Sequence, residues 1–156
     1  MNKQRPVYLD YQATTPLDPR VYKSMQPYFK EQFGNPHSHN HTMGWESHAA
    51  VEKARKEVAE MICADANEIV FTSGATESIN LALKGCFPAN ENASFSIVTS
   101  SVEHQAVLET CQHLEKRGAS LAIFPVLKTG LMDWDNAEIP PGDGTGMLAI
   151  QYANNE

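Results

Sequence analysis

The residues with the clearest chemical potential lie in the stretch FTSGATES, residues 71–78, where a β-branched and aromatic run meets an apolar-periodic segment. This order predicts a strand that turns directly into a helix. The first amides of a helix lack carbonyl acceptors and carry partial positive charge, so such a corner favours a phosphate group. Gly74 and Ala75 would allow close approach, and Thr76 would add a hydroxyl donor. A plain helix cap is the alternative interpretation of the same residue types.

Two more positions could do chemistry at the ends of expected strands. His104 follows one strand at the start of a helix, and Asn154 and Asn155 follow the last strand. A histidine ring can stack on a flat ligand and exchange protons near neutral pH. The simpler alternatives are a histidine in a cap region and a pair of turn-forming asparagines.

A group of histidines raises the question of a metal site, and its members are His37, His39, His41 and His48. Alternating histidines can ligate a metal from one face of a strand. The neighbouring Gly34-Asn35-Pro36 instead predicts a loop, and no cysteine or carboxylate cluster is close in the sequence. We therefore expect no metal site.

The elements that must position these residues follow from hydrophobic periodicity and turn signals. Helices are expected from Pro19 onward, over 45–62, over 76–84 with a stop at Gly85, and up to Gly118. Strands are expected over 68–72, 95–99, 120–126 and 147–152. The spacing of residues 100–103 predicts a capping box, and residues 138–146 have the composition of a turn. Alternating strands and helices predict an α/β fold with a mainly parallel sheet. We expect an arm and loop over residues 1–45 and the α/β body over residues 46–156.

Composition excludes several classes of function. Nineteen acidic and twelve basic residues among 156 give a net charge of −7, which argues against binding nucleic acid or an anionic membrane. No apolar run approaches the roughly 18 residues of a membrane helix, and the N-terminus lacks a signal-peptide pattern. The three cysteines have no paired spacing, so we expect reduced thiols and a cytoplasmic location.

Several motifs together resemble those of one enzyme family. They are YLDYQATTPLDPRV, FGNPHSHNHTMGWE, EIVFTSGATESINLALKG, SSVEHQAVLETC and ANNE, and they occur in the family's order and at similar spacing. The sequence thus resembles the cysteine desulfurases of the NifS/IscS type, within the class V aminotransferases of fold-type I. The resemblance covers essentially the whole chain. It implies the front half of the large α/β domain that binds pyridoxal 5'-phosphate, preceded by a helical arm.

The resemblance also implies a role for each matching residue. Ala75 and Thr76 would bind the cofactor phosphate through backbone amides and the threonine hydroxyl. His104 would stack against the pyridine ring and transfer protons. Asn155 would donate a hydrogen bond to the phenolic oxygen, near the substrate carboxylate, which favours the phenolate.

The implied reaction converts L-cysteine to alanine and leaves the sulfur as a persulfide for iron–sulfur cluster or thio-cofactor assembly. The family's cofactor-binding lysine in a Ser-x-His-Lys motif, its ring-nitrogen aspartate and its mobile-loop cysteine have no match in these 156 residues. We therefore expect an N-terminal segment that is inactive alone. Expected partners are a second copy, a complementary or full-length subunit, and a sulfur-acceptor or scaffold protein. The alternatives are a non-catalytic truncated interaction fragment, or a segment of a selenocysteine lyase or class V aminotransferase.

Overall fold

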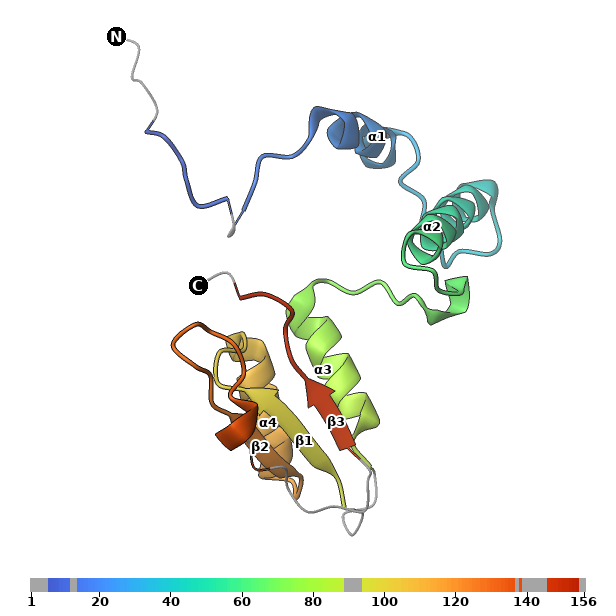
Figure 1. Cartoon of the computed structure of the whole chain (residues 1–156). Coiled ribbons are helices and arrows are strands. Elements are labelled where there is room, and N and C mark those ends of the chain that lie inside the picture. Colours follow the sequence, from blue (N-terminus) through green and yellow to red (C-terminus); the bar gives the residue numbers. More distant parts are fainter. Residues whose placement is uncertain (1–5, 12–13, 89–93, 137, 139–145, 155–156) are drawn as a thin grey trace. The chain divides into compact units, whose positions relative to one another are not determined.

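The computed structural model describes residues 6–11, 14–88, 94–136, 138 and 146–154. The chain divides into two compact units, Met1–Phe71 and Thr72–Glu156 (Figure 1). The expected division between an arm ending at residue 45 and a body beginning at residue 46 stays a prediction. Helix α2, Thr42–Met61, runs across these positions within the first unit.

The first unit contains helix α1, Pro19–Lys30, helix α2 and a short 3-10 helix, η1, at Ala66–Glu68. The predicted start of α1 is confirmed, because the Asp18 carboxylate accepts the backbone N–H of Arg20 at 2.7 Å and Pro19 occupies the first helical position.

Helix α2 begins three residues before the predicted Trp45, because a histidine caps it. The Nδ1 atom of His41 accepts the backbone N–H of Gly44 at 3.1 Å. Gly44 must be a glycine here, since a Cβ would overlap the carbonyl oxygen of Ser38. Histidine is not among the usual capping residues, so the sequence pattern placed the start too late.

The strand predicted over 68–72 is wrong. Glu68 ends the 3-10 helix η1, and Ile69 is extended, with φ −91° and ψ 124°, but no described strand pairs with residues 69–72. β-branched and aromatic residues favour an extended backbone, whereas a strand also needs a neighbour with which to exchange hydrogen bonds. Composition predicted the first property and could not supply the second.

The second unit is a small α/β layer. Its parallel sheet has the order β2-β1-β3, formed by Ser96–Ser100 (β1), Ser120–Phe124 (β2) and Gly146–Ala149 (β3). Helices α3, Ala75–Cys86, and α4, Gln105–Glu115, pack against each other and against this sheet (Figure 1). The predicted fold class, α/β with a mainly parallel sheet, is therefore confirmed.

The core of this unit lies where the two helices meet the sheet. It is formed by Leu83 of α3, by Phe95 and Ile97, by Val107, Cys111 and Leu114 of α4, and by Ala119. Ile97, Cys111 and Leu114 are completely buried. Because this core fixes the helices on the sheet, it also fixes the helix starts that carry the candidate site.

Several predicted boundaries are wrong by a few residues. Helix α3 passes through Gly85, its expected stop, and ends at Cys86 because Phe87 is extended ahead of Pro88. Strand β2 stops at Phe124, after which Val126 makes only an isolated bridge, and β3 stops at Ala149 rather than at Tyr152. The turn expected over 138–146 lies almost entirely outside the described residues.

The predicted capping box at 100–103 is also wrong. Helix α4 begins at Gln105, with His104 as its N-cap and Gly118 just beyond its end. Ser100 belongs to strand β1, and its hydroxyl donates to the Glu103 carboxylate at 2.7 Å. The two side chains interact as their spacing suggests, but ahead of the helix rather than inside it.

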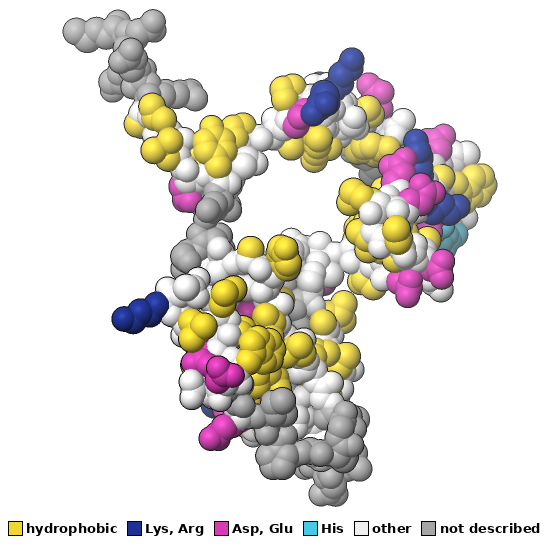
Figure 2. Space-filling model, in the orientation of Figure 1, with side chains coloured by type: hydrophobic (Ala, Val, Ile, Leu, Met, Phe, Trp, Pro, Cys, Tyr) yellow, Lys and Arg dark blue, Asp and Glu magenta, His cyan; other side chains and the backbone are white. Residues whose placement is uncertain are grey.

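Large apolar side chains are numerous on the surface of both units (Figure 2). In the first unit Phe29 is 70% exposed and Met61 78%, and in the second Leu148 is 62% exposed. Apolar exposure on this scale is typical of surfaces that another polypeptide covers. Among the described residues, no helix is both long and apolar enough to cross a membrane.

Candidate active site

The corner before helix α3 has the geometry expected of an anion site. Gly74 is the N-cap, with φ 159° and ψ −176°, a region that glycine tolerates far better than other residues. The first hydrogen bond of the helix runs from the Ser78 N–H to the Gly74 carbonyl at 3.1 Å. The amides of Ala75 and Thr76 come before it and have no acceptor within the helix. Both residues are exposed, so their N–H groups are available to a ligand.

Side chains hold this corner in shape. The Glu77 carboxylate accepts the backbone N–H of Ser73 at 2.7 Å and the Ser73 hydroxyl at 2.6 Å. These two hydrogen bonds, the hydroxyl first, hold the pKa of Glu77 below its usual value. The hydroxyls of Thr72 and Ser78 share a further hydrogen bond of 2.6 Å. Glu77 is thus turned back onto Ser73.

His104 lies at the start of helix α4 and caps it. Its Nδ1 atom accepts the backbone N–H of Ala106 at 3.1 Å. A nitrogen that accepts a hydrogen bond carries no proton, so the neutral ring carries its proton on Nε2. The side chain is exposed, which leaves Nε2 able to donate or exchange that proton.

Thr76 and His104 line the same hollow between helices α3 and α4, together with Asn80, Lys84 and Glu109. We call it the α3–α4 hollow. The structure thus brings together two of the four predicted site residues, and Ala75 is adjacent to Thr76 as the first residue of α3. Asn155, the fourth, lies outside the described residues.

His104 also lines a second, more apolar hollow that reaches strand β3. Its other lining residues include Leu83, Glu103, Ala149 and Gln151. His104 therefore lies between the start of α3 and the segment that leads to the asparagine pair. Within that segment Asn154 donates its side-chain amide to the carbonyl oxygen of Val102.

Sequence reasoning missed two residues that shape this region, Glu77 and Glu103. Glu103 is only 7% exposed, and its carboxylate accepts the Ser100 hydroxyl and the backbone N–H of Gln151. The signal for Glu103 was the Ser-x-x-Glu spacing, which was attributed to a helix start. The signal for Glu77 was its place in the first turn of a helix, where a carboxylate can reach back to a free N–H.

All three cysteines are free, as expected, with Cys63 and Cys86 exposed and Cys111 buried. Burial raises the pKa of the Cys111 thiol, and the nearby charge of Glu103 raises it further. Cys111 therefore stays a protonated core thiol at neutral pH.

The loop before helix α2 gives its histidines structural contacts. His41 caps the helix, and the rings of His39 and His48 meet edge to face with centroids 6.2 Å apart. Across the described ranges of the chain, no three histidine, cysteine or carboxylate side chains are grouped so that they could hold a metal.

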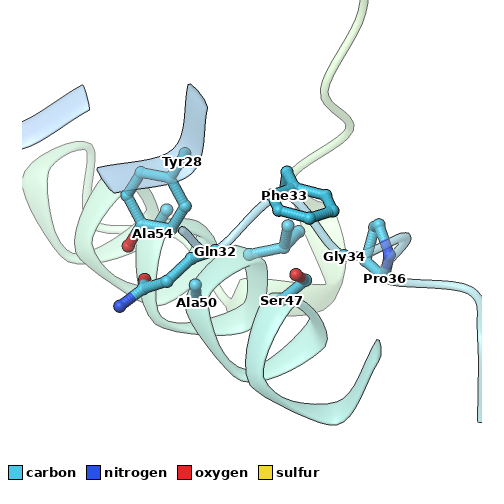
Figure 3. Close-up of a pocket in the computed structure, with 9 residues that line it drawn as sticks. Tyr28, Gln32, Phe33, Gly34, Pro36, Ser47, Ala50 and Ala54 are labelled. Carbon is cyan, nitrogen blue, oxygen red and sulfur yellow. The ribbon is translucent and has the colours of Figure 1, made fainter. Parts of the chain in front are cut away.

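The first unit carries its own groove, between helices α1 and α2 (Figure 3). Tyr28, Phe33 and Pro36 face it, and Ala50 and Ala54 form its floor on α2. Its lining is mainly apolar, with Gln32 and Ser47 as the polar side chains drawn, and the sticks show no acidic, basic or histidine side chain. The groove is thus suited to packing rather than to chemistry.

The α/β fold, with an anion corner and an exposed imidazole at neighbouring helix starts, agrees with the comparison to known proteins. Residues 7–156 match the Aminotransferase class-V family, and the chain belongs to that family. Its relatives there are cysteine desulfurases: the chain is 48% identical over 155 residues to cysteine desulfurase IscS of Rickettsia felis. This match covers 99% of the chain and 38% of the relative, so the chain spans well under half of the relative's length.

Solved structures agree with this assignment. A NifS-like protein superposes with a TM-score of 0.86 at 38% identity, covering 96% of this chain and 41% of its own. SspA, solved in complex with cysteine, gives a TM-score of 0.79 at 33% identity and covers 96% of this chain and 43% of its own. The N-terminal portion of the desulfurase fold is therefore present here.

Pyridoxal phosphate is the cofactor of class V aminotransferases and cysteine desulfurases. The residues of this chain fit its phosphate. The Ala75 and Thr76 amides have no acceptor in the helix, and nothing lies within 4 Å of the position that a Cβ on Gly74 would occupy. The neighbouring hollow carries an imidazole suited to an aromatic ring.

Proposed function

We propose that this chain is the N-terminal segment of a pyridoxal-phosphate-dependent cysteine desulfurase, and that it supplies the phosphate corner and the ring-stacking histidine. The observation that carries the proposal is that Thr76 and His104, from different helices, line one hollow. The 48% identity to a cysteine desulfurase favours L-cysteine as the substrate. The products would be alanine and a protein-bound persulfide for iron–sulfur cluster or thio-cofactor assembly.

Each site residue has a distinct task in this proposal. The amides of Ala75 and Thr76, with the Thr76 hydroxyl, would bind the phosphate. His104 would stack on the ring and exchange the proton on Nε2, and Asn155 would donate a hydrogen bond to the phenolic oxygen. When bound, the cofactor supplies an electron sink for the substrate carbon. The helix cap on Nδ1 keeps the His104 ring in one tautomer, so proton exchange is confined to the other nitrogen.

The covalent chemistry needs groups that this sequence does not match to the family pattern. No lysine stands in a Ser-x-His-Lys context, and none of the three cysteines matches the family's nucleophile. We propose that the chain alone is inactive and pairs with a second copy or with a full-length subunit. Its exposed apolar side chains support pairing, and its three free thiols support a reducing, cytoplasmic location.

Binding of pyridoxamine 5'-phosphate to the 156-residue chain tests the site, because this ligand cannot condense with surface lysines. We expect it to bind at least tenfold more tightly than pyridoxamine, which lacks the phosphate, in a fluorescence or calorimetric titration. Thr76→Val should reduce this preference several-fold. His104→Ala should weaken both ligands equally and leave the preference unchanged.

Thr129→Val is the matched control, since Thr129 is an exposed threonine in a turn of the second unit. Equal affinity of the unmodified chain for the two ligands would contradict a phosphate corner at Ala75 and Thr76. Alanine release from L-cysteine by the chain with pyridoxal phosphate would contradict its proposed inactivity.

A further inference from the structure

We propose that Glu103 is a positioning residue, whose carboxylate holds His104 and the segment after strand β3 together at one edge of the sheet. Glu103 directly precedes His104 in the sequence, and Gln151 begins the segment that leads to the asparagine pair. The consequence for cofactor binding rests on the function proposed above, whereas the contacts themselves do not.

Both oxygens of the Glu103 carboxylate accept hydrogen bonds. Its two oxygens lie 2.9 and 3.1 Å from the backbone nitrogen of Gln151, and Oε1 also accepts the Ser100 hydroxyl at 2.7 Å. The side chain is 7% exposed, and burying an uncompensated carboxylate would be costly. Hydrogen bonds to a charged acceptor are about twice as strong as neutral ones, which compensates for this burial.

A second set of contacts runs through the preceding residue. The carbonyl oxygen of Val102 accepts the side-chain amides of Gln151 and Asn154. Residues 102 and 103 together therefore fix residues 151–154, which lie about fifty positions later in the chain. We call this set of contacts the Glu103 clamp.

The clamp lies between the ends of strands β1 and β3, which carry the two parts of the candidate site. Thr99 on strand β1 already contacts strand β3, since its hydroxyl donates to the Ala149 carbonyl at 2.8 Å. The pairing of β1 with β3 ends at Ala149, and beyond it the clamp links Glu103 to Gln151. The clamp thus adds contacts between the chain carrying His104 and the chain carrying Asn154 beyond the last paired residues of the two strands.

A carboxylate suits this position because both groups that hydrogen-bond to it act as donors. The Gln151 backbone N–H and the Ser100 hydroxyl both require an acceptor. A glutamine of the same length has one acceptor oxygen, and its NH₂ group would face a donor. Glu103→Gln therefore keeps the size of the side chain and weakens the part of the clamp that the carboxylate makes, because it removes one acceptor oxygen and the negative charge.

Hydrogen exchange of the 156-residue chain, followed by NMR, tests the clamp. Glu103→Gln should speed exchange of the Gln151 amide about tenfold or more. It should also speed exchange of the Ala106 amide, which donates to His104, while the Ser78 amide of helix α3 stays unchanged. Glu115→Gln, at an exposed glutamate that ends helix α4, is the matched control and should change none of the three amides.

If the Gln151 amide exchanges faster and the Ala106 amide does not, the proposal is overturned. Glu103 would then connect the two chain segments without positioning His104. If Glu103→Gln also exposes Ser78, the second unit has unfolded, and Glu103→Asp decides instead. Aspartate keeps the charge but loses the reach, so we expect faster exchange at Gln151 and Ala106 there too. Protection equal to that of the unmodified chain would overturn the clamp.

Ligand affinity is a second test, because a purely structural role of Glu103 would leave it unchanged. Glu103→Gln should weaken pyridoxamine 5'-phosphate and pyridoxamine by the same factor, about threefold or more, because the phosphate corner on helix α3 is untouched. Unchanged affinity for both ligands would overturn the positioning role. If the unmodified chain binds both ligands equally, the proposed phosphate corner fails, and the exchange measurements still decide the clamp.

Discussion

The guanidinium of Arg55 lies over the ring of Phe71, 5.0 Å from the ring centroid, and also donates to the carbonyl oxygen of Ile69. Glu52, one turn earlier on helix α2, holds the Arg55 Nε atom at 3.0 Å. One side chain thus fastens the extended segment after η1 to helix α2. This explains why residues 69–71 have a defined path although no described strand pairs with them.

Replacing Arg55 with lysine should release that segment. Lysine keeps the positive charge but lacks the planar guanidinium, which hydrogen-bonds the Ile69 carbonyl and stacks on Phe71 at the same time. The lost contacts are worth about 1–2 kcal/mol, so we expect roughly tenfold faster chymotrypsin cleavage after Phe71. Lys53→Arg, in an exposed pair with Glu57 on the same helix, is the control. Equal cleavage rates for the two variants would contradict this role of Arg55.

Acid should loosen the start of helix α3 through Glu77. The pKa of Glu77 is lowered from 4.5 by the Ser73 hydroxyl and amide, so the folded state favours the carboxylate. A lowered pKa contributes stability that is fully present above the unfolded value and is lost as the pH falls through the folded value. We expect the Ser73 and Ser78 amides to exchange faster below about pH 4.5, after correction for intrinsic rates.

Glu77→Gln provides the comparison for this pH effect. It should remove the acid-dependent part of the change, because a glutamine does not titrate in this range. An identical pH dependence in the variant and the unmodified chain would assign the effect to another carboxylate.

Alkylation should separate the three cysteines. Iodoacetamide reacts with the thiolate form of cysteine. Cys111 is buried, and desolvation followed by the charge of Glu103 raises the pKa of its thiol. At pH 8 we expect Cys63 and Cys86 to be modified at least a hundredfold faster than Cys111, as followed by mass spectrometry. In urea the three rates should converge. Rapid modification of Cys111 in the folded chain would contradict its place in the core.

Leu114 is a sensitive position for the stability of the second unit. Its side chain is completely buried in the core beneath helix α4. Leu114→Ala should lower the free energy of unfolding by about 2–5 kcal/mol in urea titrations, because removing the side chain leaves a cavity. Leu131→Ala, at a leucine that is 68% exposed, should change it by less than about 0.5 kcal/mol. A similar loss in both variants would mean that the cavity does not explain the effect.

The success of sequence reasoning depended on how local each signal was. Asp18 and Pro19 predicted the start of α1, because a cap and a proline act within one turn. The alternation that predicted a parallel sheet was correct for β1, α4 and β2. The stop at Gly85 was wrong because a helix tolerates one glycine, and the Phe87-Pro88 pair ended it instead.

The residues of the candidate site likewise fall into those that a local pattern could predict and those that it could not. Ala75, Thr76 and His104 could be named from the sequence, because a helix start after a small, hydroxyl-rich turn has a local signature, and the family resemblance gave them roles. Glu103 could not be assigned, since its partner Gln151 is 48 positions away and no spacing rule connects them.

The sequence by itself thus determined the α/β class, the start of helix α1 and the small, hydroxyl-rich corner before helix α3, because these follow from periodicity, capping and turn chemistry within a few positions. The family was indicated by the resemblance of the motifs, and the family match agrees with it. Only the tertiary structure decided that Thr76 and His104 share one hollow and that Glu103 reaches Gln151. Packing of Leu83, Ile97 and Leu114 into one core sets those distances. Such packing joins residues that are far apart in the chain, so no local pattern encodes it.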